Sequence, residues 1–125
     1  MKQITAIIRP QMANATREAL IGIGVYACTA RKVLGRGKGS VDFRVINAAK
    51  EGNEEAIARL GDGPLLIPKR LLMLVVPDDK APIVVQTILD ANKTGAPGDG
   101  KIFVSAVNEA VRIRTGERDS KALKE

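Results

Sequence analysis

Hydrophobic positions in the first part of the chain predict a strand, a helix and a second strand, in that order. Residues 3–9 alternate with the two-residue period of a β-strand, and Pro10 ends the hydrogen-bonding ladder because it lacks an N–H group. Apolar residues then recur at helical spacing until Gly22 and Gly24, which are expected to end the helix. Residues 26–34 form the next predicted strand.

The second half of the chain repeats this order of elements. Residues 70–76 are an almost unbroken apolar run, and Pro77 ends this strand at the entrance to a helix over residues 81–92. Residues 101–107 supply the last strand. Two strand–helix–strand units predict a single domain over residues 1–125, of the α+β class and with the ferredoxin-like β-α-β-β-α-β arrangement. In that arrangement both helices cover one face of a four-stranded antiparallel sheet.

The third predicted strand is apolar on both of its faces. Its residues alternate between the two faces as Leu71, Met73 and Val75 against Leu72, Leu74 and Val76. Helices can cover only one of these faces, so the other is expected to be buried against further copies of the chain. We therefore predict an oligomer.

A long interval separates the second and third predicted strands, between Gly35 and Pro68. Loops longer than about 12–15 residues are usually functional or disordered in compact domains. The interval is rich in charged residues, and only residues 54–60 have helical character. A functional loop and a disordered linker both remain open on this pattern.

Composition narrows the partners and the chemistry of the chain. The formal net charge of +6 favours anionic partners, but one tyrosine and two phenylalanines offer little to stack on unpaired bases. Nucleic acid is therefore not expected, and nucleotide phosphates are the better anion. The chain contains no histidine, the commonest general base, and its serines have no evident base partner. We do not expect an enzyme.

Cysteine content and hydropathy bear on the location of the protein. Cys28 is the single cysteine, so a disulfide within the chain and a cysteine-rich metal cluster are excluded, and no metal-ligating set of side chains is identified. No apolar run approaches the roughly 20 residues needed to cross a bilayer, and the N-terminal residues lack the apolar stretch of a signal peptide. The expectation is a cytoplasmic protein without direct membrane insertion.

Three glycines and a lysine follow the second helix in the segment Gly95-Ala96-Pro97-Gly98-Asp99-Gly100-Lys101. It matches the G-x-x-x-x-G-K part of the phosphate-binding loop pattern, but Ile102 stands where Ser or Thr is required, and a strand follows instead of a helix. Exposed N–H groups beside Lys101 suit an anion, whereas a tight turn explains the glycines equally well. Arg112 and Arg114 favour the anion, because an extended segment would place both guanidinium groups on one side.

At these residues the sequence resembles the PII nitrogen-regulatory proteins. The resemblance covers nearly everything outside the long interval, and it is carried by Ile7-Ile8-Arg9-Pro10, Arg17-Glu18-Ala19-Leu20, Val75-Val76-Pro77-Asp78-Asp79, Thr94-Gly95 with Gly98-Asp99-Gly100-Lys101-Ile102-Phe103-Val104, and Val111-Arg112-Ile113-Arg114-Thr115-Gly116-Glu117. It implies a homotrimer of ferredoxin-like subunits with ATP or ADP in each cleft between subunits. The long interval becomes the family's T-loop, about residues 37–68, which reports the bound ligand to partner proteins, and residues 108–125 form a C-terminal segment.

The resemblance also assigns ligand-binding residues. The nucleotide phosphates would be held from one side by Gly98, Asp99, Gly100 and Lys101 and from the other by Arg112 and Arg114. The rest of the nucleotide site would be lined by Thr29, Gly35, Gly37, Lys38 and Val75. For the effector 2-oxoglutarate, Lys69 matches a family lysine that pairs with a carboxylate. Gly39 stands at the place of a family glutamine that helps to ligate 2-oxoglutarate and the Mg²⁺ that can accompany ATP.

Features of the long interval resemble the branch of the family that is encoded in nitrogen-fixation operons. The interval is longer than in the members that regulate glutamine synthetase, and it lacks the tyrosine that those members carry as a uridylylation site. Members of the nitrogen-fixation branch form complexes with a sister PII protein and inhibit nitrogenase, and 2-oxoglutarate relieves the inhibition. The resemblance thus implies an enzyme regulator that transduces a signal without turnover.

Other functions remain open on the sequence. Within the family, the chain could regulate glutamine synthetase or an ammonium transporter, with Arg44 or Arg59 inserted into the transporter's pore. It could instead be a slow nucleotide hydrolase in which Asp99 orients water. A third alternative is a ferredoxin-like module whose positive charge binds acidic proteins.

Overall fold

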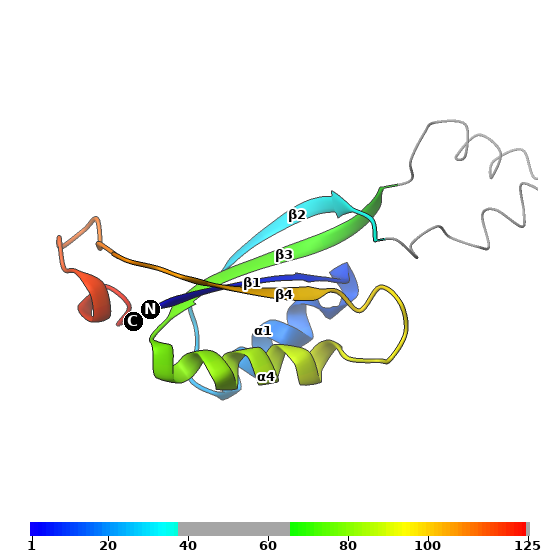
Figure 1. The fold of residues 1–125 in the computed structure, drawn as a ribbon, viewed down its shortest axis with the longest axis horizontal. Helices are drawn as coiled ribbons and strands as arrows, with labels where there is room; N and C mark the ends of the chain where they lie inside the picture. The colour runs from blue at the N-terminus through cyan, green and yellow to red at the C-terminus, as the bar shows by residue number, and fades with distance from the viewer. Residues whose placement is uncertain (38–65, 125) are drawn as a thin grey trace, which may run out of the picture.

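The computed structural model describes residues 1–37 and 66–124, which form a four-stranded antiparallel sheet with two α-helices on one face (Figure 1). The elements in chain order are β1 (Lys2–Ile8), the 3₁₀ turn η1 (Pro10–Met12), α1 (Ala13–Gly22), β2 (Thr29–Gly35), β3 (Ile67–Val76), the 3₁₀ turn η2 (Asp78–Lys80), α4 (Ala81–Asn92), β4 (Lys101–Ala106) and the 3₁₀ turn η3 (Asp119–Lys121). The predicted ferredoxin-like β-α-β-β-α-β fold is confirmed.

The register of the sheet brings several strand ends together. The strand order is β2-β3-β1-β4, so β1 pairs with both β3 and β4. Near the end of β1, Ile8 pairs with Arg70 of β3 and Ile7 pairs with Lys101 of β4. β2 ends at Gly35 beside the start of β3. The end of β1, the start of β3, the start of β4 and the end of β2 therefore lie at the same end of the sheet.

The core lies between the sheet and the two helices. Its buried residues alternate along β1 and β3 and continue onto the facing sides of the helices: Ile4, Ala6, Ile8, Leu72, Leu74, Val76, Leu20, Val84 and Ile88. Full burial of an aliphatic side chain of this size contributes roughly 1.5–3 kcal/mol. The two-residue periods predicted for both strands are thus confirmed by the burial.

The opposite face of the sheet is also apolar, as the sequence predicted. Leu71, Met73 and Val75 on β3 are only half-buried, in contrast to their neighbours in the core. Phe103 of β4 pairs with Thr5 on this same face and is 53% exposed. Among the described residues both helices lie on the other side (Figure 1). This face is therefore available to another subunit.

A buried polar pair joins the two helices. The Nδ2 atom of Asn92, at the end of α4, donates to the Thr16 hydroxyl of α1 at 2.9 Å and to the Ile88 carbonyl at 2.8 Å. Thr16 in turn donates to the Met12 carbonyl at 2.7 Å. These bonds fix the end of α4 and hence the direction in which the following loop leaves the helix.

In the described ranges, no helix is long and apolar enough to cross a membrane.

Two strand starts differ from the prediction by three residues, and the other strand ends agree within one residue. β2 begins at Thr29 and not at Tyr26, because the preceding residues end α1 and cross to the sheet: Val25 donates its N–H to the Leu20 carbonyl and buries its side chain in the core. β3 begins three residues before Arg70, at Ile67. Pro68 is tolerated there because β1 has already ended, so β3 has only β2 as a neighbour.

Candidate functional site

The glycine-rich loop joins α4 to β4 at the end of the sheet where β1 ends. Gly95, Gly98 and Gly100 all have positive φ angles, of 84°, 96° and 111°. At Gly100 a Cβ atom would lie 1.9 Å from the carbonyl oxygen of Ile7, so only glycine lets the loop approach β1 this closely. The tight turn therefore accounts for the glycines here. A tight turn is also compatible with anion binding by the loop.

The carboxylate of Asp99 organises this loop from within. It accepts hydrogen bonds from the Thr94 hydroxyl at 2.5 Å, the Thr94 N–H at 2.8 Å and the Gly95 N–H at 3.0 Å. Arg9 adds an ion pair, with 2.7 Å between Nη1 and Oδ1. The Thr94 hydroxyl first of all, then the Thr94 N–H and the Arg9 guanidinium, hold the pKa of Asp99 well below its usual range.

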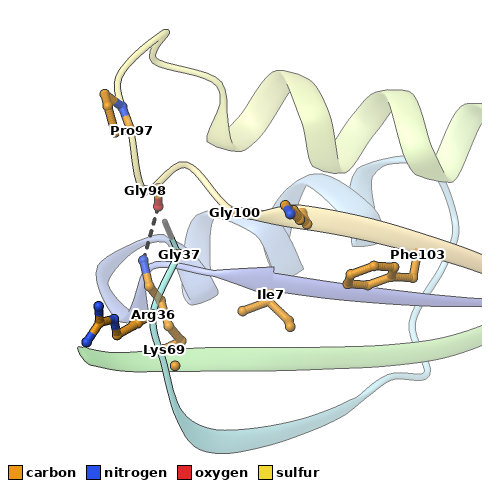
Figure 2. A pocket seen from close by; sticks show the side chains of 10 residues that line it. Ile7, Arg36, Gly37, Lys69, Pro97, Gly98, Gly100 and Phe103 are labelled. Atoms are coloured by element: carbon orange, nitrogen blue, oxygen red, sulfur yellow. Dashed lines mark hydrogen bonds between the residues drawn. The ribbon is translucent and has the colours of Figure 1, made fainter. Parts of the chain in front are cut away.

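Two cations at the strand ends hold the outer part of the loop. The second arm of Arg9 donates from Nη2 to the Pro97 carbonyl at 3.0 Å. Lys69, near the start of β3, donates from Nζ to the Gly98 carbonyl at 3.2 Å, the dashed line in Figure 2. The loop is thus tied to β1 and to β3 at once.

A cleft of about 320 Å³ opens between this loop and the end of β2. Its lining combines the loop, the strand ends and the residues that follow β2: Ile7, Gly35, Arg36, Gly37, Lys69, Pro97, Gly98, Gly100, Lys101 and Phe103. In Figure 2, Lys69 points toward Gly98, while Ile7 and Phe103 lie along the sheet beside it. The predicted residues Gly35, Gly37, Lys69, Gly98, Gly100 and Lys101 are therefore brought together.

The composition of the cleft suits a ligand that is part flat and apolar, part anionic. Ile7 and Phe103 offer apolar surface, and Arg36, Lys69 and Lys101 bring three positive charges to the lining. Guanidinium and ammonium groups form their strongest hydrogen bonds with phosphate and carboxylate. These residues fit a nucleotide, with its base against the apolar side chains and its phosphates beside the cations.

Other predicted nucleotide-binding residues lie away from this cleft, from the middle of the sheet to beyond its opposite end. Thr29 is the first of the seven residues of β2, about 20 Å along the strand from Gly35. Val75 lines a second cleft, of about 420 Å³, which it shares with Tyr26 and with Leu123 of the C-terminal segment. Figure 1 shows that this segment, which carries Arg112 and Arg114, lies beyond the other end of the sheet from the glycine loop. A single subunit therefore holds the predicted residues as two separate groups.

The C-terminal arginines are not arranged as predicted. Instead of an extended run, residues 112–116 form a turn: the Gly116 N–H donates to the Arg112 carbonyl at 2.7 Å, and the Arg112 N–H donates to the Glu117 carbonyl at 2.8 Å. Gly116, with a φ of 72°, turns the chain back so that Val111 bridges Arg118. The expectation that extension places both guanidinium groups on one side is thus wrong, because no neighbouring strand extends this run within the described part of the chain.

The guanidinium of Arg112 is bonded to its own C-terminal segment. It forms an ion pair with Glu117 at 3.1 Å between Nη1 and Oε1. Its Nη2 donates to the carbonyls of Lys121 at 3.2 Å, Ala122 at 3.4 Å and Lys124. Only 25% of this side chain is exposed. A phosphate that binds Arg112 through Nη2 has to replace some of these carbonyl oxygens.

Sequence reasoning missed several residues of this site, and part of it lies outside the described residues. Lys38 and Gly39, assigned to the nucleotide and to 2-oxoglutarate, fall outside them, as does most of the predicted T-loop. Arg9 was not assigned a site role, because its partner Asp99 is 90 positions away in the sequence. Arg36 and Phe103 were also missed. Phe103 could have been found, since it is two residues from Lys101 and so shares its face of β4.

Comparison with known proteins agrees with this fold. The family described as Nitrogen regulatory protein P-II matches residues 1–117. The chain is 45% identical over 129 residues to a "Nitrogen fixation nifHD region GlnB-like protein 2" of Methanobacterium ivanovii, covering 98% of this chain and 99% of that protein. A protein with the same description from Methanococcus maripaludis is 43% identical over 128 residues, covering 98% and 100%. The crystal structure of Arabidopsis thaliana PII bound to citrate superposes with a TM-score of 0.74 at 31% identity, covering 99% of this chain and 90% of that one.

The described residues form a small ferredoxin-like fold with a cationic cleft beside the glycine-rich loop. The chain belongs to the P-II family of nitrogen regulatory proteins. Its similarity to proteins that are named after the nitrogen-fixation nifHD region agrees with the resemblance to the nitrogen-fixation branch. P-II proteins are signal-transducing regulators and not enzymes.

Proposed function

We propose that this protein binds ATP or ADP in clefts between the subunits of a homotrimer and passes the signal to a nitrogen-fixation target. The observation that carries the proposal is the cleft beside the glycine loop, where Lys69 and Lys101 meet the apolar surface of Ile7 and Phe103. Nucleotide binding and trimeric assembly are typical of the P-II family. A subunit that holds its predicted site residues in two distant groups agrees with a site completed by a neighbour.

Assembly is supported by the uncovered face of the sheet. Leu71, Met73 and Val75 are half-buried there, beside the half-exposed Phe103. Burial of this surface between copies would supply the hydrophobic driving force for a trimer. Light scattering at micromolar concentration is expected to give three times the subunit mass, and a monomer would contradict the proposal.

The effector and the metal are supported by fewer residues. Lys69 lines the cleft, and its Nζ donates to a carbonyl oxygen. The same ammonium group could instead bind a carboxylate of 2-oxoglutarate. In the described ranges, no group of His, Cys, Asp and Glu side chains could hold a metal ion. Mg²⁺ would thus arrive with the nucleotide phosphates and not occupy a prebuilt carboxylate site.

The arrangement of Asp99 favours binding over hydrolysis. A general base needs a pKa near the working pH and a lone pair directed at water. Asp99 has a lowered pKa, and its two oxygens accept from Thr94, Gly95 and Arg9. These bonds leave it as a loop-organising residue, so we prefer a regulator that binds ligands without turnover.

Nitrogenase is the proposed target, because the similar proteins are described by the nifHD region. A sister PII protein would share the trimer or the complex. Co-purification with nitrogenase components would support this target, whereas recovery with membranes would favour an ammonium transporter. Recovery with glutamine synthetase would point to the remaining alternative.

Calorimetric titration of ATP tests the site itself. Lys101→Ala and Arg114→Ala are each expected to weaken ATP by about 1–3 kcal/mol, the scale of a lost charge-assisted contact. Arg17→Ala is the matched control, since Arg17 is an exposed cation of α1 away from the cleft. Unchanged affinity in both site variants would refute the placement of the nucleotide.

A further inference from the structure

Arg9 holds the glycine-rich loop from the end of β1. It follows Ile8, the last residue of the strand, and precedes Pro10, the first residue of η1, so its backbone is fixed on both sides. One arm of its guanidinium bonds Asp99 at 2.7 Å, and the other bonds the Pro97 carbonyl at 3.0 Å. A planar guanidinium with two engaged arms fixes the direction of both partners.

Asp99 extends this hold to the first residues of the loop. The Asp99 carboxylate, which is paired with Arg9, also accepts hydrogen bonds from the N–H and hydroxyl of Thr94 and from the N–H of Gly95. The Arg9 side chain also lies directly against Gly98, with Nη2 3.3 Å from where a Cβ atom would be. Glycine-rich segments lose the most conformational freedom on ordering. The side chain that directly follows β1 therefore fixes the start, the middle and the end of this loop.

Arg9 acts from outside the cleft that would receive the nucleotide. The described residues lining that cleft include the cations Arg36, Lys69 and Lys101, but not Arg9. Arg9 lines an adjacent groove together with Pro10 and Gln11. Its side chain is only 22% exposed, and both of its arms are already engaged within the subunit.

We infer that Arg9 is a positioning residue for nucleotide binding, which orients the phosphate-facing loop through Asp99 without contacting the ligand. The inference rests on the proposed nucleotide site. A loop held in its binding conformation before the ligand arrives avoids the entropy cost of ordering at that moment. Loss of Arg9 leaves Lys101 in place on β4, but the N–H groups of the loop are no longer held toward the phosphates.

The test combines ATP calorimetry with amide hydrogen exchange of Gly95–Lys101 on the full-length protein. Arg9→Ala is expected to speed exchange in this loop and to weaken ATP by about tenfold or more, by loss of preorganisation. Arg9→Lys keeps a cation for Asp99 but loses the second arm, so its ATP affinity should fall less. Arg17→Ala, which removes one exposed cation from α1, should change neither measurement.

A double-mutant cycle separates positioning from direct contact. Arg9→Ala and Asp99→Asn break the same pair, so the loss of ATP affinity in the double variant should be smaller than the sum of the two single losses. Additive losses would show that Arg9 contacts the nucleotide directly, and they would overturn the inference, as would unchanged loop exchange in Arg9→Ala. If the unmodified protein binds no ATP, the proposed function fails and the inference falls with it. If it binds ATP and Arg9→Ala binds equally well, only the inference falls.

Discussion

The guanidinium of Arg9 and the carboxylate of Asp99 meet at 2.7 Å, although 90 positions separate them in the sequence. The pair joins the end of β1 to the loop that precedes β4. β1 and β4 are neighbours in the sheet, and this ion pair links the two strands just beyond the end of their hydrogen-bonded pairing. The fold thereby turns a run of glycines, which alone would be flexible, into a defined surface beside the cleft.

The lowered pKa of Asp99 predicts a dependence of stability on pH. Its pKa in the folded protein lies below the value of about 3.9 in the unfolded chain, so its contribution is complete above that value. The contribution is lost as the pH falls further, through the folded pKa. We expect Asp99→Asn to lower the thermal midpoint at pH 7, and the gap to the unmodified protein to shrink below about pH 4. A gap of the same size at every pH would contradict the assigned bonds.

Gly100 should be the most sensitive position of the loop. In Gly100→Ala the new Cβ would be 1.9 Å from the Ile7 carbonyl oxygen, which is part of the backbone of β1 and cannot move aside. We expect a loss of about 3 kcal/mol or more in the free energy of unfolding, measured by denaturant titration. Gly95→Ala is the matched control: its φ is 84° but nothing lies within 4 Å, so a loss of about 1–2 kcal/mol from backbone strain alone is expected. Equal losses would show that the close approach to β1 is not the cause.

The C-terminal segment should compete with phosphate for Arg112. The Nη2 atom of Arg112 is bonded to the carbonyls of Lys121, Ala122 and Lys124. If Arg112 binds ATP as proposed, truncation after Ser120 should raise the ATP affinity severalfold, because fewer contacts have to be broken first. In an Arg112→Ala background the same truncation should have no effect. An equal gain in both backgrounds would place the effect of the truncation elsewhere.

Prolines and alternating residues made most of the fold predictable. Pro10 and Pro77 each end a strand at the entrance to a helical segment, and the predicted helix over residues 81–92 coincides with α4. The two apolar faces of β3 could also be read directly from its alternation. These features are local, because each depends on residues within a few positions of one another.

The missed features depend on distant or turn-forming partners. Arg9 could not be assigned because its two bonds reach residues 88 and 90 positions away. Val111–Arg114 alternates like a strand, but the glycine that follows, Gly116, reverses the chain and leaves Ile113 fully exposed. That glycine is a turn signal of its own and should have outweighed the alternation.

The central claim, that each nucleotide site is built from two subunits, is tested most directly by mixing two defective variants. Lys101→Ala removes a residue of the glycine-loop group, and Arg114→Ala removes one from the distant C-terminal group. Neither variant alone should have tight ATP sites. Trimers formed from equal amounts of both would contain some clefts in which each subunit supplies the residue that the other lacks.

The measurement is the number of tight ATP sites per subunit in the mixed protein, determined by calorimetry after co-expression. Random assembly into a ring predicts tight binding in about one quarter of the clefts, relative to the unmodified protein. No tight site in the mixture would mean that Lys101 and Arg114 are needed in the same chain, and this result would contradict the shared site.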